Sequence, residues 1–552
     1  MRALAACAVS LAAFACLAPA AGAMAAAAAA STADEPYIYA HHRVSTIVGA
    51  AQAAFDRGLT LIYAYQHEEA EQAFRQAARL DPSLALAWWG VALALGPNIN
   101  TVPDPKRTVQ AATAINRARL LAARQATPAE RDYVEALARR YSKDPTPDFD
   151  ALAIGYREAM RALVAHHPDD PDAAALYAEA IMDLRPWRLW SSDGQPEPGT
   201  LELVDLIERG LRAHPDHLGL MHYYIHAVEA SNDPGRALAA ARRLVATRVE
   251  PAAAHLVHMP AHTFLRVGDW QAAIDANEHA LHHSLDYRLS KDPEAEHVCG
   301  HCLDFLAYAY TMQGNLAGAR RAAEGSRAID GNVSNLVAVL TTFHDWPALL
   351  ALPEPAEAKQ QGGPDPHVVR AYWHYGRGLA ELGGGAPARA ADELAALRRE
   401  AALAPAALAL PVDRPDIAHA YDNLQPAGDA AMLELAAHFL EAQLAAARGQ
   451  AGKSIALLRE ATAFQDRAPY AEPPLWPEPL RRSLGAALSR SGAAQEAVQA
   501  FRDSLRSVPH DPRALVGLRA ALAAAGRTVE AAALDTEIAA AQRAADQPLA
   551  AD

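Results

Sequence analysis

Histidines recur between residues 217 and 301 at spacings that suit metal chemistry. Two segments carry most of them, His222-Tyr-Tyr-Ile-His226 and His255-Leu-Val-His258-Met-Pro-Ala-His262. Residues three, four or seven apart lie on one face of a helix, so each segment would present its imidazoles on one side. Three histidines, or two histidines and a carboxylate, with one open position are the usual layout of a catalytic metal centre. The spacing therefore predicts a transition-metal site.

We expect the metal to lie between two i, i+4 pairs, because each pair chelates from a single helix. The candidate ligands are His222, His226, His255, His258, His262, His301 and Asp304. Glu229 follows His226 by one turn, where it would orient a ligand or act as a general base for metal-bound water. Tyr308 is the second candidate catalytic side chain. Imidazole ligands leave copper, zinc and iron open as the metal.

The same histidines also fit a second interpretation, in which they pack within a groove or bind an acidic peptide. The zincin protease pattern does not apply, because Tyr223 stands beside His222 where that pattern has Glu. Four other sites, His166-His167, His279, His282-His283 and His297, fall near expected helix ends or in loops, and we treat them as surface residues.

The chain holds four cysteines, and two of them, Cys299 and Cys302, flank Gly300-His301. This spacing matches the redox box of disulfide isomerases over four residues only, and that box needs a preceding strand that is not expected here. We expect the pair to form a disulfide after export or to supply soft metal ligands beside His301.

A repeat register frames the chain at both ends. It is formed by Ala54, Gly58, Leu61, Ala70, Phe74, Ala77 and Pro82, and it returns at Leu484-Gly485, Leu488, Ala497, Phe501 and Pro509. The chain thus resembles the tetratricopeptide repeat family, in which small residues allow two antiparallel helices to approach and large ones fill the space between them. The resemblance implies an all-α fold, a right-handed α-solenoid of tetratricopeptide-like helix hairpins.

The central repeats align with this register when Met221, Val257 and Leu303 are made equivalent. His222 then matches His258 and Asp304, and His226 matches His262 and Tyr308. His255 and His301 share a third position. Equivalent residues of successive first helices stack side by side in a solenoid, and in tetratricopeptide proteins these positions line the concave groove. The resemblance therefore implies that three neighbouring helices direct their histidines to one patch.

Helix pairs are expected at residues 216–230 and 233–247, 251–267 and 269–284, 298–313 and 316–329, 368–382 and 388–399, and 430–447 and 453–464. Three segments interrupt the period: residues 185–199 and 470–479 are rich in Pro and carry tryptophans, and residues 286–296 lengthen one repeat. Tryptophans in such loops need something to cover, and long loops in compact arrays are usually functional.

The N-terminal residues read as a secretory signal peptide, with an early Arg2, an apolar stretch and an Ala21-Gly-Ala23 end. The product is then exported and periplasmic. The expected parts are a signal peptide at 1–23, a flexible segment at 24–50, N-terminal repeats at 51–145, a central His-rich region at 146–345, degenerate repeats at 346–470, C-terminal repeats at 471–540 and a tail at 541–552.

Charge narrows the choice of partners. A formal charge of −15 without a Lys/Arg cluster argues against nucleic acid, and no apolar stretch predicts a transmembrane segment. Two function classes remain. One is a metal-dependent oxidoreductase or hydrolase acting on a small molecule held under the tryptophan loops. The other is a non-catalytic interaction scaffold that binds a peptide or envelope partner in its groove.

Overall fold

The computed structural model describes residues 37–144, 146–290, 295–356, 364–404, 421–468 and 470–550. Side chains are described over the same ranges except at 286–290, 295–299, 330 and 421–428. The expected signal peptide lies outside the described residues. Residues Tyr39–Asp552 form one compact unit, which contains the site discussed below.

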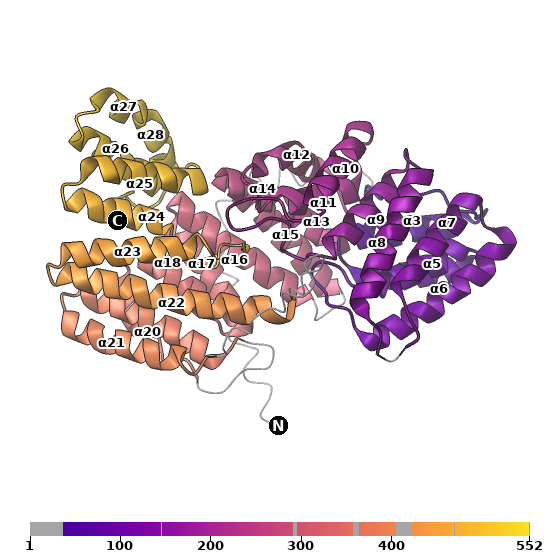
Figure 1. Ribbon diagram of the computed structural model, residues 1–552, viewed down its shortest axis with the longest axis horizontal. Helices are drawn as coiled ribbons and strands as arrows, with labels where there is room; N and C mark the ends of the chain where they lie inside the picture. The colour runs from indigo at the N-terminus through magenta and orange to yellow at the C-terminus, as the bar shows by residue number, and fades with distance from the viewer. Residues whose placement is uncertain are drawn as a thin grey trace. The chain divides into compact units, whose positions relative to one another are not determined.

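Helices make up the regular structure of the described ranges, where no strand occurs beyond two isolated bridges, Asn98 with Thr101 and Trp190 with Pro196 (Figure 1). The N-terminal helices are α3 (Gly49–Tyr63), α4 (His67–Leu80), α5 (Ala85–Ala94), α6 (Pro105–Gln125), α7 (Pro128–Leu137), α8 (Phe149–His166), α9 (Pro171–Met182) and α10 (Thr200–Ala213). The central helices are α11 (Leu218–Val228), α12 (Leu238–Ala246), α13 (Ala254–His258), α14 (Pro260–Val267), α15 (Trp270–Ser290), α16 (Ala295–Gln313) and α17 (Leu316–Asp330). The C-terminal helices are α18 (Ser334–Thr342), α19 (Trp346–Ala351), α20 (Pro366–Gly383), α21 (Pro387–Ala401), α22 (Tyr421–Ala447), α23 (Ala451–Gln465), α24 (Leu480–Arg490), α25 (Ala494–Ser507), α26 (Pro512–Ala524), α27 (Thr528–Ala533) and α28 (Asp535–Ala544).

Consecutive helices pack as hairpins, and small residues at their contacts explain how closely they approach. The ring of Phe74 on α4 lies between Gly58 on α3 and Gly90 on α5, and a Cβ at either glycine would come within 3 Å of that ring. Phe501 lies between Gly485 and Gly517 in the same way. One large side chain thus joins a hairpin to the next one, as the repeat register requires. The predicted all-α solenoid of tetratricopeptide-like hairpins is confirmed.

The histidine-bearing helices are first helices of successive hairpins. Helix α11 contacts α14, and α13 contacts α16, so these helices are direct neighbours. The single helix expected at 251–267 is divided into a short 3-10 turn at Pro251–Ala253, then α13 and α14. Pro260 accounts for the second break, because proline has no N–H to donate to the preceding turn.

Helices α15 and α16 are longer than expected. They extend to Ser290 and begin at Ala295, so most of the predicted interruption at 286–296 is helical. The other two interruptions are non-helical, as predicted. Trp187 and Trp190 in the first donate their indole N–H groups to the carbonyl oxygens of Ile99 and Ala227, at 3.0 and 2.8 Å. Trp476 in the second is buried against Tyr372, Tyr375 and Phe439.

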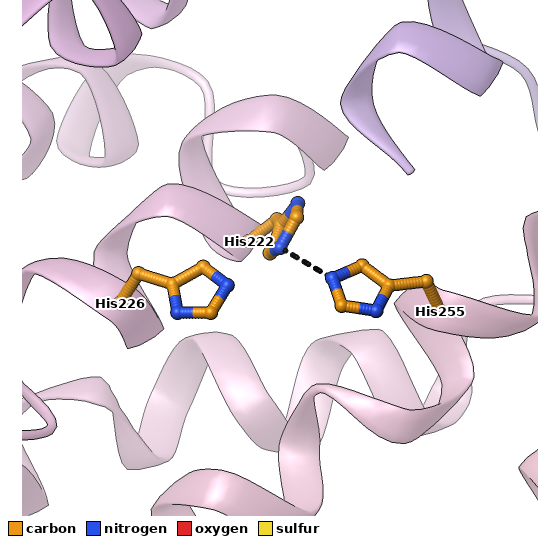
Figure 2. Close-up of side chains that lie close together, drawn as sticks. All are labelled: His222, His226 and His255. Carbon is orange, nitrogen blue, oxygen red and sulfur yellow. Dashed lines mark hydrogen bonds between the residues drawn. The ribbon is translucent and has the colours of Figure 1, made fainter. Parts of the chain in front are cut away.

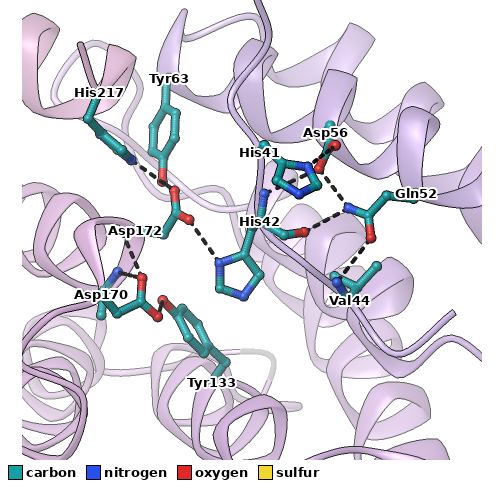
Figure 3. A network of polar contacts seen from close by, with 11 residues as sticks. His41, His42, Val44, Gln52, Asp56, Tyr63, Tyr133, Asp170, Asp172 and His217 are labelled. Atoms are coloured by element: carbon teal, nitrogen blue, oxygen red, sulfur yellow. Dashed lines mark hydrogen bonds and ion pairs between the residues drawn. The ribbon is translucent and has the colours of Figure 1, made fainter. Parts of the chain in front are cut away.

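The segment before α3 is extended, and hydrogen bonds hold it to the repeats (Figure 3). The Nδ1 atom of His42 lies 2.8 Å from a carboxylate oxygen of Asp172 at the start of α9. The second oxygen of Asp172 accepts from Tyr63, at 2.5 Å, and lies 3.0 Å from Nε2 of His217. A flexible segment was expected at 24–50, whereas residues 40–46 make these and further hydrogen bonds.

Segments far apart in the sequence also meet. The indole N–H of Trp270 on α15 donates to the carbonyl oxygen of His510, and Arg513 on α26 donates to the carbonyl oxygen of Thr311 on α16, at 3.2 and 2.9 Å. The C-terminal hairpins therefore pack against the central ones. This contact brings the loop at 470–479 to the histidine-bearing helices. No helix of the described ranges has both the length and the apolar character needed to cross a bilayer.

Candidate metal centre

The first histidine cluster joins His222 and His226 of α11 to His255 of α13 (Figure 2). One ring nitrogen from each residue lies within 4.8 Å of the other two. His222 and His226 are almost fully buried, and His255 is partly exposed. Figure 2 shows the three rings converging on one point from two helices. The i, i+4 pair and a third ligand from the next repeat thus meet in space.

The second cluster repeats this arrangement one hairpin later. It joins His258 of α13 and His262 of α14 to His301 of α16, again with one nitrogen from each within 4.8 Å of the others. The ring of Phe305 packs against all three imidazoles, with centroid distances of 4.7 to 4.9 Å. The four histidines expected around one ion are therefore divided between two clusters.

Hydrogen bonds at Nδ1 fix the tautomer of four of these histidines. His222 donates to the carbonyl oxygen of Tyr63 at 2.6 Å, and His258 donates to Oδ1 of Asn277 at 2.6 Å. The amide of Asn277 is itself oriented, because its nitrogen donates to the carbonyl oxygen of Ala273. A neutral imidazole with its hydrogen on Nδ1 has a lone pair on Nε2. Each of these rings therefore offers Nε2 to a metal, and its Nδ1 partner acts as an orienting group.

Glu229 is the hydrogen-bond partner of Nδ1 in the remaining two histidines, His226 and His262. Its Oε1 lies 2.8 Å from Nδ1 of His226, and its Oε2 lies 2.9 Å from Nδ1 of His262. One carboxylate thus orients one ligand in each cluster. With both oxygens occupied by imidazoles, Glu229 has the geometry of an orienting group rather than of a free general base.

The Nε2 atoms face one another at short range. Those of His222 and His255 are 3.2 Å apart, close to the about 3.3 Å expected for two imidazole nitrogens on one tetrahedral zinc ion. Those of His258 and His262 are 2.7 Å apart. Nε2 of His226 is buried and has no hydrogen-bond partner among the described residues. A buried lone pair without a donor is costly, and a metal ion would remove that cost.

Burial dominates the electrostatics of the site. It lowers the pKa of His222, His255 and His258 well below the ordinary value of 6.5, and that of His226 to about 3. Burial also acts to lower the pKa of His262, but Glu472 and Glu229 outweigh it and hold that pKa at about 10. Four of the imidazoles are therefore neutral at physiological pH, which is the form that binds metals.

Glu472 reaches the centre from the loop at 470–479, and its side chain is only 6% exposed. Its carboxylate contacts Nδ1 of His262 and is hydrogen-bonded to Glu229. Burial, then repulsion from Glu229, raises the pKa of Glu472 to about 7. A carboxyl with this pKa can donate to Glu229 near neutral pH, so the two acidic groups coexist beside one imidazole.

Two aromatic residues with left-handed backbone geometry flank the first cluster. Tyr65 has a φ of 56°, and its ring centroid lies 4.6 Å from that of His222. Trp187 has a φ of 60°, and its ring lies 5.4 Å from that of His226, edge to face. A positive φ is unfavourable for bulky residues and is found where the surrounding structure enforces it, often at functional sites.

A pocket of about 310 Å³, including its open mouth, lies beside His226 and Glu229. The other residues that line it are Ile99, Met182, Arg185, Trp187, Leu189, Ala230 and Tyr470. Most of them are apolar, and Trp187 and Tyr470 come from the two proline-rich loops. Arg185 is the exception: its Nε–H is buried and has no acceptor among the described residues. The enclosed part of this pocket is only about 20 Å³, which is room for a water-sized molecule.

Two of the predicted site residues lie elsewhere. Asp304 accepts hydrogen bonds from Ser326 and Asn335, both at 2.6 Å, and belongs to none of the clusters found among the described residues. Tyr308 is buried with its ring 6.3 Å from that of Trp270, and burial raises its pKa. Neither residue lines the pocket.

The cysteine pair is described only in part. Cys302 is buried, with its sulfur 3.8 Å from Nδ1 of His258, and the side chain of Cys299 lies outside the described residues. Whether the two are joined stays a prediction.

Sequence reasoning did not identify Glu472, Asn277 or Tyr63 as partners of the histidines. Of these partners, only Glu472 lies in a segment that the sequence marks as unusual: the loop at 470–479 interrupts the repeat and is rich in proline and aromatic residues.

The chain matches no protein-family model and no curated protein. Solved structures similar to it include a human IFIT1 dimer with m7Gppp-AAAA, at 12% identity over 91% of this chain and 92% of that one, with a TM-score of 0.31. Another is yeast Tom70, at 9% identity over 90% of this chain and 95% of that one, with a TM-score of 0.29.

Proposed function

We propose that the chain is an exported metalloprotein that binds a transition-metal ion through His222, His226 and His255. The observation that carries this proposal is the buried Nε2 atom of His226, which lacks a hydrogen-bond partner among the described residues and converges with two further imidazoles. Copper, zinc and iron all accept such ligands. The signal-peptide pattern of residues 1–23 supports export to the periplasm.

The layout favours a catalytic centre over a structural one. Structural zinc sites hold four protein ligands, whereas catalytic sites keep three and leave a position open. The pocket beside His226 gives a small molecule access to that position. A metal ion there would supply Lewis-acid or redox chemistry, so the proposed class is a metal-dependent hydrolase or oxidoreductase. Trp187 and Tyr470 would line the approach of a substrate of only a few atoms, and Arg185 would meet its acceptor group.

Metal analysis of the purified chain tests the proposal. The metal-free protein is incubated separately with Cu(II), Zn(II), Fe(II) and Ni(II), desalted and analysed for bound metal. We expect tight binding of at least one metal and an affinity at least about 100-fold lower in His226→Ala, since even loss of an orienting group costs about 10- to 100-fold. His282→Ala is the matched control, because His282 is exposed and bonds only the carbonyl oxygen of Glu278. Failure of every metal to bind would refute the proposal.

A further inference from the structure

We propose that the chain binds two metal ions, one in each histidine cluster, and that Glu229 couples them as a dinuclear centre. The inference rests on the proposed function, because it takes the first ion as given. It adds a second metal site formed by His258, His262 and His301.

The second histidine cluster repeats the first one hairpin later. His258 and His262 follow His222 and His226 by 36 residues each, and they occupy the same places on the first helix of the next hairpin. His301 joins this pair from the following repeat, as His255 joins His222 and His226. Each cluster therefore takes an i, i+4 pair from one repeat and a single histidine from the following repeat. Whatever geometry suits the first cluster for a metal is reproduced in the second.

Hydrogen bonds orient the ring nitrogens of the second cluster. Nδ1 of His258 donates to Asn277, and Nδ1 of His262 faces the oxygens of Glu229 and Glu472. Their Nε2 atoms lie 2.7 Å apart in a fully buried place, where one shared hydrogen joins them in an N–H···N bond. A metal ion that took the place of this hydrogen would be bound by both Nε2 atoms, while each Nδ1 kept its present partner. Imidazole nitrogens that share one metal ion at about 2.0 Å from each are separated by about 2.8 to 3.3 Å.

One carboxylate links the two clusters. Glu229 bonds His226 of one cluster and His262 of the other through different oxygens. The rings of His226 and His262 lie 5.6 Å apart, and those of His255 and His258 lie 6.0 Å apart. Two ions held by six neutral imidazoles would leave buried positive charge, and Glu229 with Glu472 supplies the nearest counter-charge. Both acidic groups stand between the clusters, where a two-ion centre needs them.

One arrangement competes with this one. One ring nitrogen each of His226 and His262 and a carboxylate oxygen of Glu229 also lie within 4.8 Å of one another, so a single ion could bind there. It would have to displace the hydrogens that now join these groups, and the tautomers of both histidines would change. An experiment must therefore distinguish two ions at Nε2 from one ion at Nδ1.

The test counts ions and asks whether they interact. Metal-free full-length protein is loaded with Cu(II), and bound copper per chain is measured together with the electron paramagnetic resonance spectrum. We expect two ions in the unchanged chain, with a spectrum of spin-coupled copper. His301→Asn should retain one ion and show the signal of isolated Cu(II), because it removes a ligand from the second cluster only. His301 is only partly buried, so this change is tolerable for folding, which far-ultraviolet dichroism verifies.

The outcomes are separable. One ion that His226→Ala removes and His301→Asn does not would overturn the dinuclear inference and leave the proposed function standing. A single ion that is lost in Glu229→Ala but kept in His301→Asn would place the metal at the Nδ1 atoms of His226 and His262. That result would also overturn the dinuclear inference. Two ions in His301→Asn would place the second ion elsewhere. No bound ion would refute both proposals. If His301→Asn does not fold, uncoupled copper in the unchanged chain decides against the inference.

Discussion

The Nε2 atoms of His258 and His262 face each other across 2.7 Å, although both Nδ1 atoms are engaged with other groups. An i, i+4 spacing explains the proximity of the two rings, and Pro260 does not destroy it, because α13 and α14 continue in nearly the same helical path around the break. One hydrogen is shared between the two Nε2 atoms, and an ion that displaced it would be held by both rings.

Metal should stabilise the fold, because an ion that binds only the native state adds RT ln(1 + [L]/Kd) to the free energy of unfolding. At a hundredfold excess over Kd this is about 2.7 kcal/mol. We expect a chelator to lower the melting temperature of the loaded protein and the metal to restore it. The measurement is calorimetry with and without metal. His226→Ala should lose most of this response, and His282→Ala should keep it; equal responses in both variants would contradict the assignment.

Glu229→Gln should weaken metal binding at one cluster and spare the other. A glutamine offers one acceptor oxygen and one NH₂ donor, so only one of His226 and His262 can still donate from Nδ1. The other imidazole must move its hydrogen to Nε2 and can no longer bind metal there. We expect a 10- to 100-fold loss of affinity for one ion, as for other lost orienting groups, measured by competition with a chelator.

Glu208→Gln is the matched control for that change. Glu208 also accepts from two side chains, Tyr224 and Arg236, but it contacts none of the six clustered histidines. Its variant should bind metal as the unchanged chain does. If Glu229→Gln did the same, the carboxylate would not be orienting the ligands.

Much of the candidate site follows from the sequence, for physical reasons. The i, i+4 spacing at His222 and His258 fixes which side chains share a helix face, and the repeat register fixes which helices are neighbours. Together they place His255 and His301 beside the pairs of the preceding repeat. Asp304 shares a register position with His222, yet it bonds Ser326 and Asn335, because a register gives the place of a Cα atom and not the partners of its side chain.

The parts that depend on contacts between distant segments could not be predicted. Glu472 stands 210 residues after His262, and it reaches that imidazole only because the C-terminal hairpins pack against α15 and α16. No local pattern encodes such a contact. The break at Pro260 was readable in principle, since proline interrupts helices, but the alignment of the histidines across it favoured one continuous helix.

Arg185→Met should change which molecules the pocket accepts. The buried Nε–H of Arg185 would bind an anionic acceptor, and charge-assisted hydrogen bonds contribute about 1.5 to 3 kcal/mol, or about tenfold or more in affinity. Formate and formamide are suitable probes, because both are close in size to the enclosed cavity of about 20 Å³ and differ in charge. We expect the variant to lose affinity for formate only, measured by saturation-transfer NMR. Equal loss for both probes would mean that the pocket had simply changed shape.

The anchor of the N-terminal segment should make stability depend on pH. Burial acts to lower the pKa of His42, but the carboxylate of Asp172 outweighs it, and the net pKa is raised above 6.5. A histidine whose pKa is raised by folding stabilises the fold to its full extent at pH values below the unfolded-state pKa of 6.5. This contribution is lost as the pH rises through the folded-state pKa. The pKa of Asp172 is lowered despite burial, through His217 and His42, so its contribution exists above its ordinary value of 3.8.

His42→Gln should therefore cost more stability near pH 5.5 than near pH 8.5. The loss of unfolding free energy caused by this substitution can change by at most about 1.4 kcal/mol per pH unit, which is the limit for one linked proton. Denaturant unfolding at the two pH values gives the measurement. His41→Gln is the neighbouring control, since His41 is 66% exposed and bonds Asp56 (Figure 3). If His42→Gln lowered the free energy of unfolding equally at both pH values, a charged pair of His42 with Asp172 would be excluded.

Metal binding should order the loop at 470–479, and Glu472 should carry that effect. Its carboxylate is the loop's contact with His262 and Glu229, so an ion that fixes His262 also fixes the surroundings of Glu472. We expect added metal to slow hydrogen exchange in this loop of the unchanged chain. In Glu472→Ala the slowing should disappear there, while α11 remains protected by the first ion. Glu496→Ala serves as the control, because Glu496 pairs with Arg459 on the exposed surface. If the loop of Glu472→Ala still slowed on metal addition, the link between the C-terminal hairpins and the centre would run through other contacts, such as that of Arg266 with the ring of Tyr470.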